Sequence, residues 1–553
     1  MNENGPHEKV RSVEETLARL EERISKIEWA LGLGKHPEEK RAVSAKPARV
    51  EGEFEMAVGQ NLFAKVGIVV LAIGAALSLS LPWKELPPVA PSVAGWVLVV
   101  VLFVLAHWLQ HTLPLIARHF RGAGMGLLFF ATLRLCYFGA PSLWAPGSVA
   151  AATALAIAVA VNLAIGWWRN SVFLAGLALV AGFAAALAVG TPWYVFGMVS
   201  VLVLTAGFSG RIHDWPWLPV FAIPCTFLVY LIWAIGNPVA GKHAEVVTGP
   251  FACVWFLLGW MVVSAAFMSF RRDHRSEVVF AQVASVLNCG GYVLFLLHTL
   301  IRFGDRFVMA NVLASVALLG VAVMFWIRER SQFATFVYAM TGYGALTMAV
   351  IKASVVPDLF VWLSAESLLV VITAIWFRSR FIILANFLIY LAVITCYMVL
   401  VHQETGISLV FGFVALTSAR ILNWQKDRLE LKTELMRNAY LTSAFIVFPY
   451  ALYHIVPGAW AALSWVGIAL FYYMMHVFTK SRKYRWMGHN TLLLTVVYVL
   501  VMSIGKMQGT QRIVSFLVLG SVLLIVSLVF TLIRARQHRH ETHEAGENGD
   551  ADG

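Results

Sequence analysis

Long apolar stretches recur through most of this chain and restrict what it can fold into. Between Leu62 and Arg534, runs of about 20 mostly apolar residues alternate with short polar breaks. A run of that length crosses a bilayer as an α-helix, because lipid cannot satisfy an exposed backbone. Hydrophobic residues make up 59% of the 553 residues, charged residues 13%, and mean hydropathy is +0.75. We predict an all-α polytopic membrane protein with about 18 transmembrane helices in tandem hairpins.

The polar segments near both ends divide the chain into four expected parts. They are a cytoplasmic coiled-coil helix (1–35), a flexible linker (36–60), a transmembrane helical bundle (61–536) and a disordered cytoplasmic tail (537–553). The N-terminal segment has no apolar core followed by a small-residue cleavage site, so we expect no removable signal peptide there. The first apolar helix would then direct membrane insertion.

The positive charges alternate from loop to loop. Lys and Arg on the side shared with both termini outnumber those on the other side roughly threefold. Because short loops rich in Lys and Arg stay in the cytoplasm, we expect both termini to be cytoplasmic. The net charge of +12 therefore marks topology, and no nucleic-acid partner is expected.

The N-terminal segment carries apolar residues at alternating spacings of three and four. This is the pattern of a and d positions in a coiled coil. Charges at the flanking positions, such as Lys9 and Glu14, favour a parallel homo-oligomer. A single amphipathic helix lying on the membrane is the alternative. The predicted oligomerisation residues are Val10, Val13, Leu17, Leu20, Ile24, Ile27 and Leu31.

Several helices that return to the cytoplasmic side end in an aromatic residue followed closely by a basic one. Examples are WWR at 167–169, WFR at 376–378 and VFTK at 477–480. Their regular recurrence favours tandem duplication of a helical hairpin. Ordinary anchoring of aromatic and basic side chains at the membrane interface explains the same pattern without duplication.

No motif in the sequence predicts a cofactor or a metal. All five cysteines lie in predicted membrane helices without a CxxC pair, so they indicate small buried side chains: Cys136, Cys225, Cys253, Cys289 and Cys396. GxSxG, HExxH and P-loop motifs are absent. We therefore expect no cofactor, metal or catalytic residue, and an enzyme is disfavoured.

Two stretches carry a resemblance to a known family. They are NLFAKVGIVVLAIGAAL (61–77), preceded by the heptads and the linker, and RGAGMGLLFFATLRLCYFGAPSLW (121–144). In this order of segments the chain resembles bacterial inner-membrane proteins of the domain of unknown function 2339 family. The resemblance implies many tandem helices and a multi-pass location in the bacterial inner membrane. It brings no catalytic residues.

Ionisable residues within the membrane are expensive, at about 2.5 to 3.5 kcal/mol near a helix centre, so each suggests a function. Glu366 is the carboxylate nearest a helix centre and is either a proton or cation site or a neutral, hydrogen-bonded carboxyl. Arg134, within FFATLRLCYF, either snorkels to the outer interface or faces a polar cavity. Asn288 and the following Cys-Gly-Gly predict either tight helix packing or a broken transport helix.

Basic residues recur near the outward ends of the predicted helices. They form either a basic rim that holds anionic lipid or polyprenyl phosphate, or a set of independent snorkelling anchors. The set comprises Arg134, Lys242, His298, Arg302, Lys352, His402, His454 and Lys506.

Three classes of function fit these features. A transporter or a protein that handles lipid or an envelope precursor would use Arg134, Glu366 and the rim as a polar path. A non-catalytic membrane scaffold would oligomerise, or recruit a partner, through the coiled coil. A polyprenyl-linked glycosyltransferase is disfavoured, because the first outward loop offers only the carboxylate of Glu85.

Overall fold

The computed structural model describes residues 89–503 with gaps, and parts of residues 74–87 and 510–528. The gaps are 138–142, 146, 239–242, 248, 270–277, 329–330, 402–405, 425–433 and 458–459. Sixteen labelled α-helices, a shorter apolar helix at Phe516–Val526 and one short 3-10 helix make up the regular structure of these residues. The predicted coiled coil, linker and tail lie outside them.

The chain divides into two compact units, and the boundary between them in the sequence falls between Ala181 and Gly182. The first contains α5 (Ala90–Trp108), α6 (Pro114–Tyr137), α7 (Val149–Trp168) and the first part of α8 (Val172–Val189). α6 packs against both α5 and α7. Gly166 of α7 allows α8 a close approach, since a Cβ there would lie 2.9 Å from the backbone nitrogen of Ala175.

Besides the rest of α8 and the helix Phe516–Val526, the second unit contains the remaining labelled helices. They are α9 (Pro192–Ile212), α10 (Trp217–Ala234), α11 (Ala252–Ser269), α12 (Val278–Arg302), η3 (Gly304–Arg306), α13 (Phe307–Arg328), α14 (Gln332–Ala353), α15 (Asp358–Trp376), α16 (Arg380–Leu400), α17 (Ile407–Trp424), α19 (Glu434–Ile455), α20 (Ala461–Thr479) and α21 (Arg482–Ser503).

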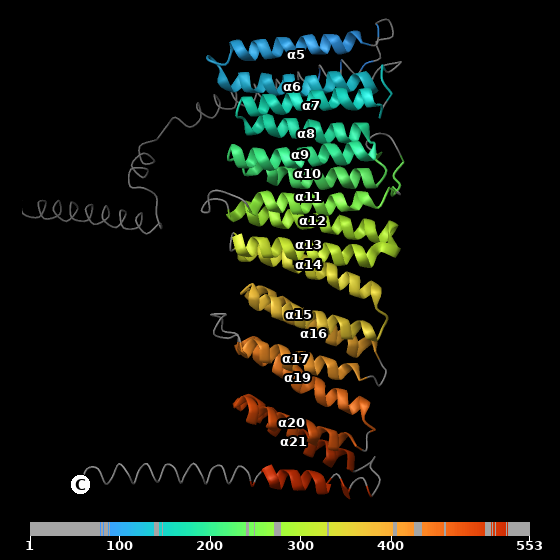
Figure 1. Ribbon diagram of the computed structural model, residues 1–553, viewed down its shortest axis with the longest axis vertical. Helices are drawn as coiled ribbons and strands as arrows, with labels where there is room; N and C mark the ends of the chain where they lie inside the picture. The colour runs from blue at the N-terminus through green and yellow to red at the C-terminus, as the bar shows by residue number, and fades with distance from the viewer. Residues whose placement is uncertain are drawn as a thin grey trace, which may run out of the picture. The chain divides into compact units, whose positions relative to one another are not determined.

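Helices of the second unit pack mainly against neighbours in the chain. The main contacts join consecutive helices, as in the pairs α13–α14, α17–α19 and α20–α21, or next-but-one helices, as in α10–α12 and α15–α17. Within this unit, Figure 1 shows the labelled helices following one another in chain order. The unit is therefore a stack of helical hairpins.

Thirteen of the described helices are long and apolar enough to cross a membrane. This confirms the prediction of an all-α polytopic membrane protein. Between 33% and 56% of each span is buried within the protein, so much of the remaining apolar surface is available to lipid. α6, α19 and α21 contain 24, 22 and 22 residues but are more polar. The total of about 18 stays a prediction, since further predicted helices lie outside the described residues.

Several aromatic and basic helix endings coincide with tight turns. Arg378 and Lys480 have φ of 47° and 50°, and Asn170, which follows WWR, has φ of 45°. A single left-handed residue stops a helix and reverses the chain. After Arg378, the side chain of Ser379 accepts a hydrogen bond from the backbone N–H of Ile382 at 3.5 Å and starts α16.

The Asn-Cys-Gly-Gly sequence lies inside one continuous helix, α12. A Cβ on Gly291 would lie 2.5 Å from the ring of Phe227 in α10, whereas one on Gly290 would meet no atom within 4 Å. Gly291 thus permits close packing of α10 on α12. Of the two interpretations of this sequence, the structure supports tight packing over a broken helix.

Candidate functional site

The carboxyl group of Glu366 lies inside the second unit, and Glu366 is 9% exposed. It follows the first residue of α15 by eight positions, which places it about 12 Å along the helix. Thr347 of α14 donates a hydrogen bond to its Oε1 at 2.8 Å. Its Oε2 is also buried and has no hydrogen-bond partner among the described residues. A carboxylate in such surroundings requires a proton or a counter-charge, so Glu366 suits proton or cation binding.

A neutral polar network begins at the residue after Glu366. The side-chain amide of Asn386 in α16 donates to the carbonyl oxygen and Oγ of Ser367 at 3.1 and 3.0 Å. The same nitrogen lies 3.1 Å from the hydroxyl of Tyr440 in α19. Tyr440 is fully buried, and Asn386 is 3% exposed. The network ties together α15, α16 and α19, starting from the residue that follows Glu366 in the sequence.

One helical turn after Asn386, a tyrosine extends the connections to the next hairpin. The hydroxyl of Tyr390 donates to the carbonyl oxygen of Phe411 in α17 at 2.6 Å. Asn386 and Tyr390 are therefore on one face of α16, spaced by four residues. Together they connect α16 to α15, α17 and α19.

The same arrangement occurs two hairpins earlier. Asn288 of α12 donates to the carbonyl oxygen of Met261 in α11 at 2.7 Å and lies 3.0 Å from the hydroxyl of Tyr338 in α14. Four residues later, Tyr292 donates to Oδ1 of Asn311 in α13 at 3.0 Å. Helices α11 to α14 are thus tied together as α15, α16, α17 and α19 are.

Sequence reasoning missed these networks, although the printed sequence contains their signal. Asn-x-x-x-Tyr occurs as NCGGY at 288–292 and as NFLIY at 386–390. In both cases the asparagine bonds to the preceding helix and the tyrosine to the following one. This correspondence supports duplication of a four-helix segment over interface anchoring alone.

Two members of the predicted basic rim share one location at the end of α12. His298 is 5% exposed, and its Nδ1 lies 2.8 Å from the hydroxyl of Tyr230 in α10. Arg302 donates to the carbonyl oxygen of Val246, in the segment that follows α10. Both side chains therefore also hold neighbouring segments together.

The other members of the predicted rim differ in exposure. Lys352 at the end of α14 and His454 at the end of α19 are exposed. Lys242, His402 and Lys506 lie outside the described residues. A common binding role for the set stays a prediction.

Arg134 belongs to the first unit and lies in the last turn of α6. It is 3% exposed, so its side chain is enclosed by protein and does not face lipid. Leu135 and Cys136 beside it belong to an apolar cluster with Ala151 of α7. Burial favours a role inside the protein over a surface anchor, and its role in binding stays a prediction.

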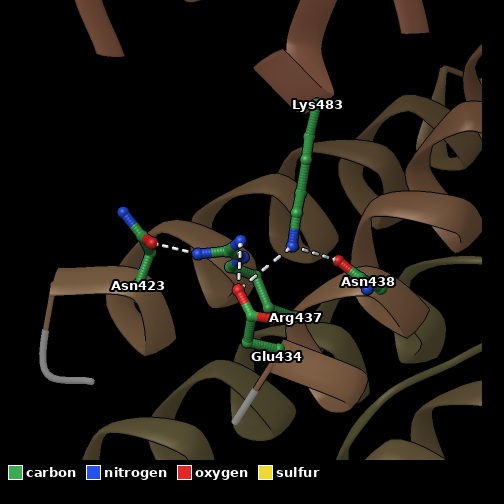
Figure 2. A network of polar contacts seen from close by, with 5 residues as sticks. All are labelled: Asn423, Glu434, Arg437, Asn438 and Lys483. Atoms are coloured by element: carbon green, nitrogen blue, oxygen red, sulfur yellow. Dashed lines mark hydrogen bonds and ion pairs between the residues drawn. The ribbon is translucent and has the colours of Figure 1, made fainter. Parts of the chain in front are cut away.

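Charged and polar side chains join α17, α19 and α21 at one end of the second unit (Figure 2). Glu434 lies 3.3 Å from Arg437 and 3.6 Å from Lys483. Lys483 also donates to Oδ1 of Asn438 at 2.6 Å, and Arg437 donates to Oδ1 of Asn423. The side chain of Glu434 is 75% exposed, so this network orients helix ends and contributes little stability.

Two further expectations concern metals and oligomerisation. Among the described residues, no group of three or more His, Cys, Asp or Glu side chains is arranged to hold a metal ion. The predicted coiled-coil residues lie outside the described part of the chain, so oligomerisation through them stays a prediction.

Comparisons with known proteins identify a family. A family model described as "Predicted membrane protein (DUF2339)" matches residues 59–454. No curated protein matches the chain, and no solved structure matches it. The matched region covers most of the chain, including Arg134, Glu366 and both Asn-x-x-x-Tyr segments. The chain therefore belongs to the DUF2339 family of predicted membrane proteins.

Proposed function

We propose that the protein is a transporter or lipid-handling protein of the bacterial inner membrane, acting on a lipid or a lipid-linked envelope precursor. The observation that carries this proposal is the Glu366 carboxyl, buried near the middle of a membrane helix with one oxygen unpartnered among the described residues. A carboxyl group kept there at a cost of a few kcal/mol suits a proton or a cation that moves with a substrate.

The surroundings of Glu366 support the same proposal. Ser367 and Asn386 hold α15 against α16, while Thr347 holds the carboxyl from α14. A binding group is effective when neighbouring hydrogen bonds fix its position. In this proposal, basic residues near the outward helix ends attract an anionic head group or a polyprenyl phosphate.

A non-catalytic scaffold is the second candidate. It is supported by the hairpin stack, in which Asn288, Asn386 and their tyrosine partners serve interhelical hydrogen bonds. In this proposal the N-terminal coiled coil forms a parallel homo-oligomer or recruits a cytoplasmic partner. Both termini are then cytoplasmic.

Complementation of a deletion strain distinguishes the two proposals. Membrane lipids and lipid-linked precursors are measured by mass spectrometry after expression of wild type, Glu366→Gln or Glu245→Gln. The control residue Glu245 is an exposed carboxylate in the segment after α10. We expect Glu245→Gln to restore the wild-type profile and Glu366→Gln to fail at normal protein abundance.

In the same experiment, full restoration of the wild-type lipid profile by Glu366→Gln would refute the transport proposal. If deletion of residues 1–35 abolishes complementation in the same experiment, the scaffold proposal is supported instead.

A further inference from the structure

An arginine-lined hollow lies in the first unit, where α6 begins, α7 ends and α8 begins. Its volume is about 480 Å³, within the range of small-molecule sites. Arg118 and Arg121 come from the first turns of α6, and Arg169 directly follows α7. Arg134 lies 13 residues after Arg121 on the same helix, about 20 Å along its axis. The hollow is therefore separate from Arg134, the candidate residue in the same unit.

The charge of the hollow is positive and uncompensated by the residues that line it. None of its lining residues is acidic, and its three arginines form no ion pair within the described part of the chain. The charges of Arg121 and Arg169 act on each other unfavourably. Three guanidinium groups gathered without a carboxylate favour an anion between them.

Neighbouring groups hold two of the arginines in place. Arg121 donates to Oε1 of Gln110 at 3.0 Å. The guanidinium carbon of Arg118 lies 5.8 Å from the ring centroid of Phe173 in α8. Arg118 and Arg169 are exposed, so both remain accessible to a ligand. The site thus combines fixed and accessible positive groups.

Ser171 also lines the hollow, and its hydroxyl group lacks a hydrogen-bond partner among the described residues. It directly precedes α8, and its carbonyl oxygen accepts a hydrogen bond from the N–H of Ala175 at 3.0 Å. A serine in this position usually uses its Oγ to cap the first turn. Here Ser171 is 9% exposed, and its Oγ has no hydrogen-bond partner among the described residues. This Oγ is buried, so a ligand in the hollow reaches it only when neighbouring side chains move, and the hydroxyl then gains the hydrogen bond that it lacks.

The start of α8 contributes further positive potential. The first backbone N–H groups of a helix lack acceptors within that helix, and its dipole places partial positive charge at this end. Helix N-termini bind phosphate groups for this reason. The three arginines, the unpartnered hydroxyl and the helix start therefore converge on one type of ligand.

We propose that this hollow binds a phosphate group, carried by an anionic lipid or present as free phosphate. Arg118 and Arg169 supply charged hydrogen bonds, Arg121 supplies fixed positive charge, and Ser171 supplies a hydroxyl donor. The site goes beyond the proposed function, since it uses neither Glu366 nor the outward basic residues. By the positive-inside rule, the hollow lies on the cytoplasmic side of the membrane.

Lipid binding to the purified full-length protein tests this proposal. Native mass spectrometry measures binding of phosphatidic acid and phosphatidylcholine, with and without inorganic phosphate as a competitor. The variants are Arg118→Gln, the double variant Arg118→Gln/Arg169→Gln, and the control Arg328→Gln. Arg328 is an exposed arginine at the end of α13, on the same predicted side.

We expect tighter binding of phosphatidic acid than of phosphatidylcholine. Arg118→Gln should weaken it by about tenfold and the double variant further, because each substitution removes a charged hydrogen bond. Arg328→Gln should bind as wild type does. Displacement of the lipid by inorganic phosphate would identify the phosphate alone as the ligand, whereas loss in the variants without displacement would identify the lipid.

Two results would overturn the proposal. One is equal binding of both lipids together with no binding of inorganic phosphate. The other is equal loss of binding in Arg118→Gln and Arg328→Gln, which would indicate nonspecific attraction to positive charge. Unchanged gel-filtration and thermal-unfolding profiles of Arg118→Gln establish that any loss is local. Neither result bears on Glu366, so failure here leaves the proposed function standing.

Discussion

Replacement of Asn386 by leucine tests the interhelical network most directly. Leucine keeps the same number of side-chain heavy atoms but removes both amide hydrogens. Asn386 is 3% exposed, and its nitrogen lies 3.0 to 3.1 Å from three oxygen atoms of α15 and α19. Two hydrogens can satisfy only two good hydrogen bonds at one time. The substitution therefore removes two bonds within the membrane.

The expected loss of stability follows from the usual strength of such bonds. Interhelical hydrogen bonds in membranes contribute about 0.6 kcal/mol on average and at most about 1.7 kcal/mol. Two bonds therefore predict a decrease of about 1 to 2 kcal/mol in the free energy of unfolding for Asn386→Leu. Asn288→Leu should lose a similar amount, because Asn288 is fully buried and makes the corresponding contacts.

Reversible unfolding of the purified protein in mixed micelles measures these values. The single variants Asn386→Leu and Tyr440→Phe and their double variant form a cycle that isolates the coupling between the two side chains. We expect a coupling of about 0.6 kcal/mol. An Asn386→Leu protein as stable as wild type, or a cycle with no coupling, would refute the view that these bonds join the hairpins.

Three further substitutions test other features. Gly291→Ala should destabilise the protein by about 1 to 3 kcal/mol, because its Cβ would overlap an aromatic ring of α10, while Gly290→Ala should change stability by less than about 0.5 kcal/mol. Thermal unfolding of both variants in one detergent checks this. Lys483→Gln should lower the free energy of unfolding by less than about 1 kcal/mol, because its ion pair with Glu434 is exposed. High salt should make this difference smaller, and unfolding measured at several salt concentrations checks it. Leu17→Asp/Leu20→Asp should abolish chemical crosslinking between copies if the heptads form the oligomer, whereas unchanged crosslinking would refute that prediction.

The sequence predicts the helical membrane fold well, because the bilayer imposes a strong and simple rule. Each span must satisfy its own backbone hydrogen bonds and present apolar side chains over about 20 residues. Hydropathy records both requirements. It also identified Glu366 and Arg134, since charges are rare within such spans, and the structure places both in buried positions.

The surroundings of those residues could not be predicted in the same way. Arg134 and Lys352 both lie near helix ends within apolar sequence, yet Arg134 is buried and Lys352 is exposed. The difference depends on which face of each helix packs inward. In a weakly amphipathic membrane helix, the pattern of apolar and polar residues does not indicate that face. Asn386 and Tyr440 escaped notice because they carry no charge, and charge is the feature that marked Glu366 and Arg134.

The arginine hollow shows a different limit of sequence reasoning. Arg118, Arg121 and Arg169 occur in two separate polar breaks, where each is explained by membrane topology alone. Their proximity arises because the α6–α7 hairpin brings the two ends of the segment back to one place. A count of charges per loop contains no information on that convergence.

The hairpin stack of the second unit also has a consequence for biogenesis. Its main contacts join helices that are close in the chain, so each hairpin can dock as soon as it leaves the insertion machinery. In such an array, stability is approximately a sum over units and the interfaces between neighbours. Hairpins can then be gained or lost at an end of the array without rebuilding its centre. Variation in chain length among homologous proteins is the evolutionary result that this architecture permits.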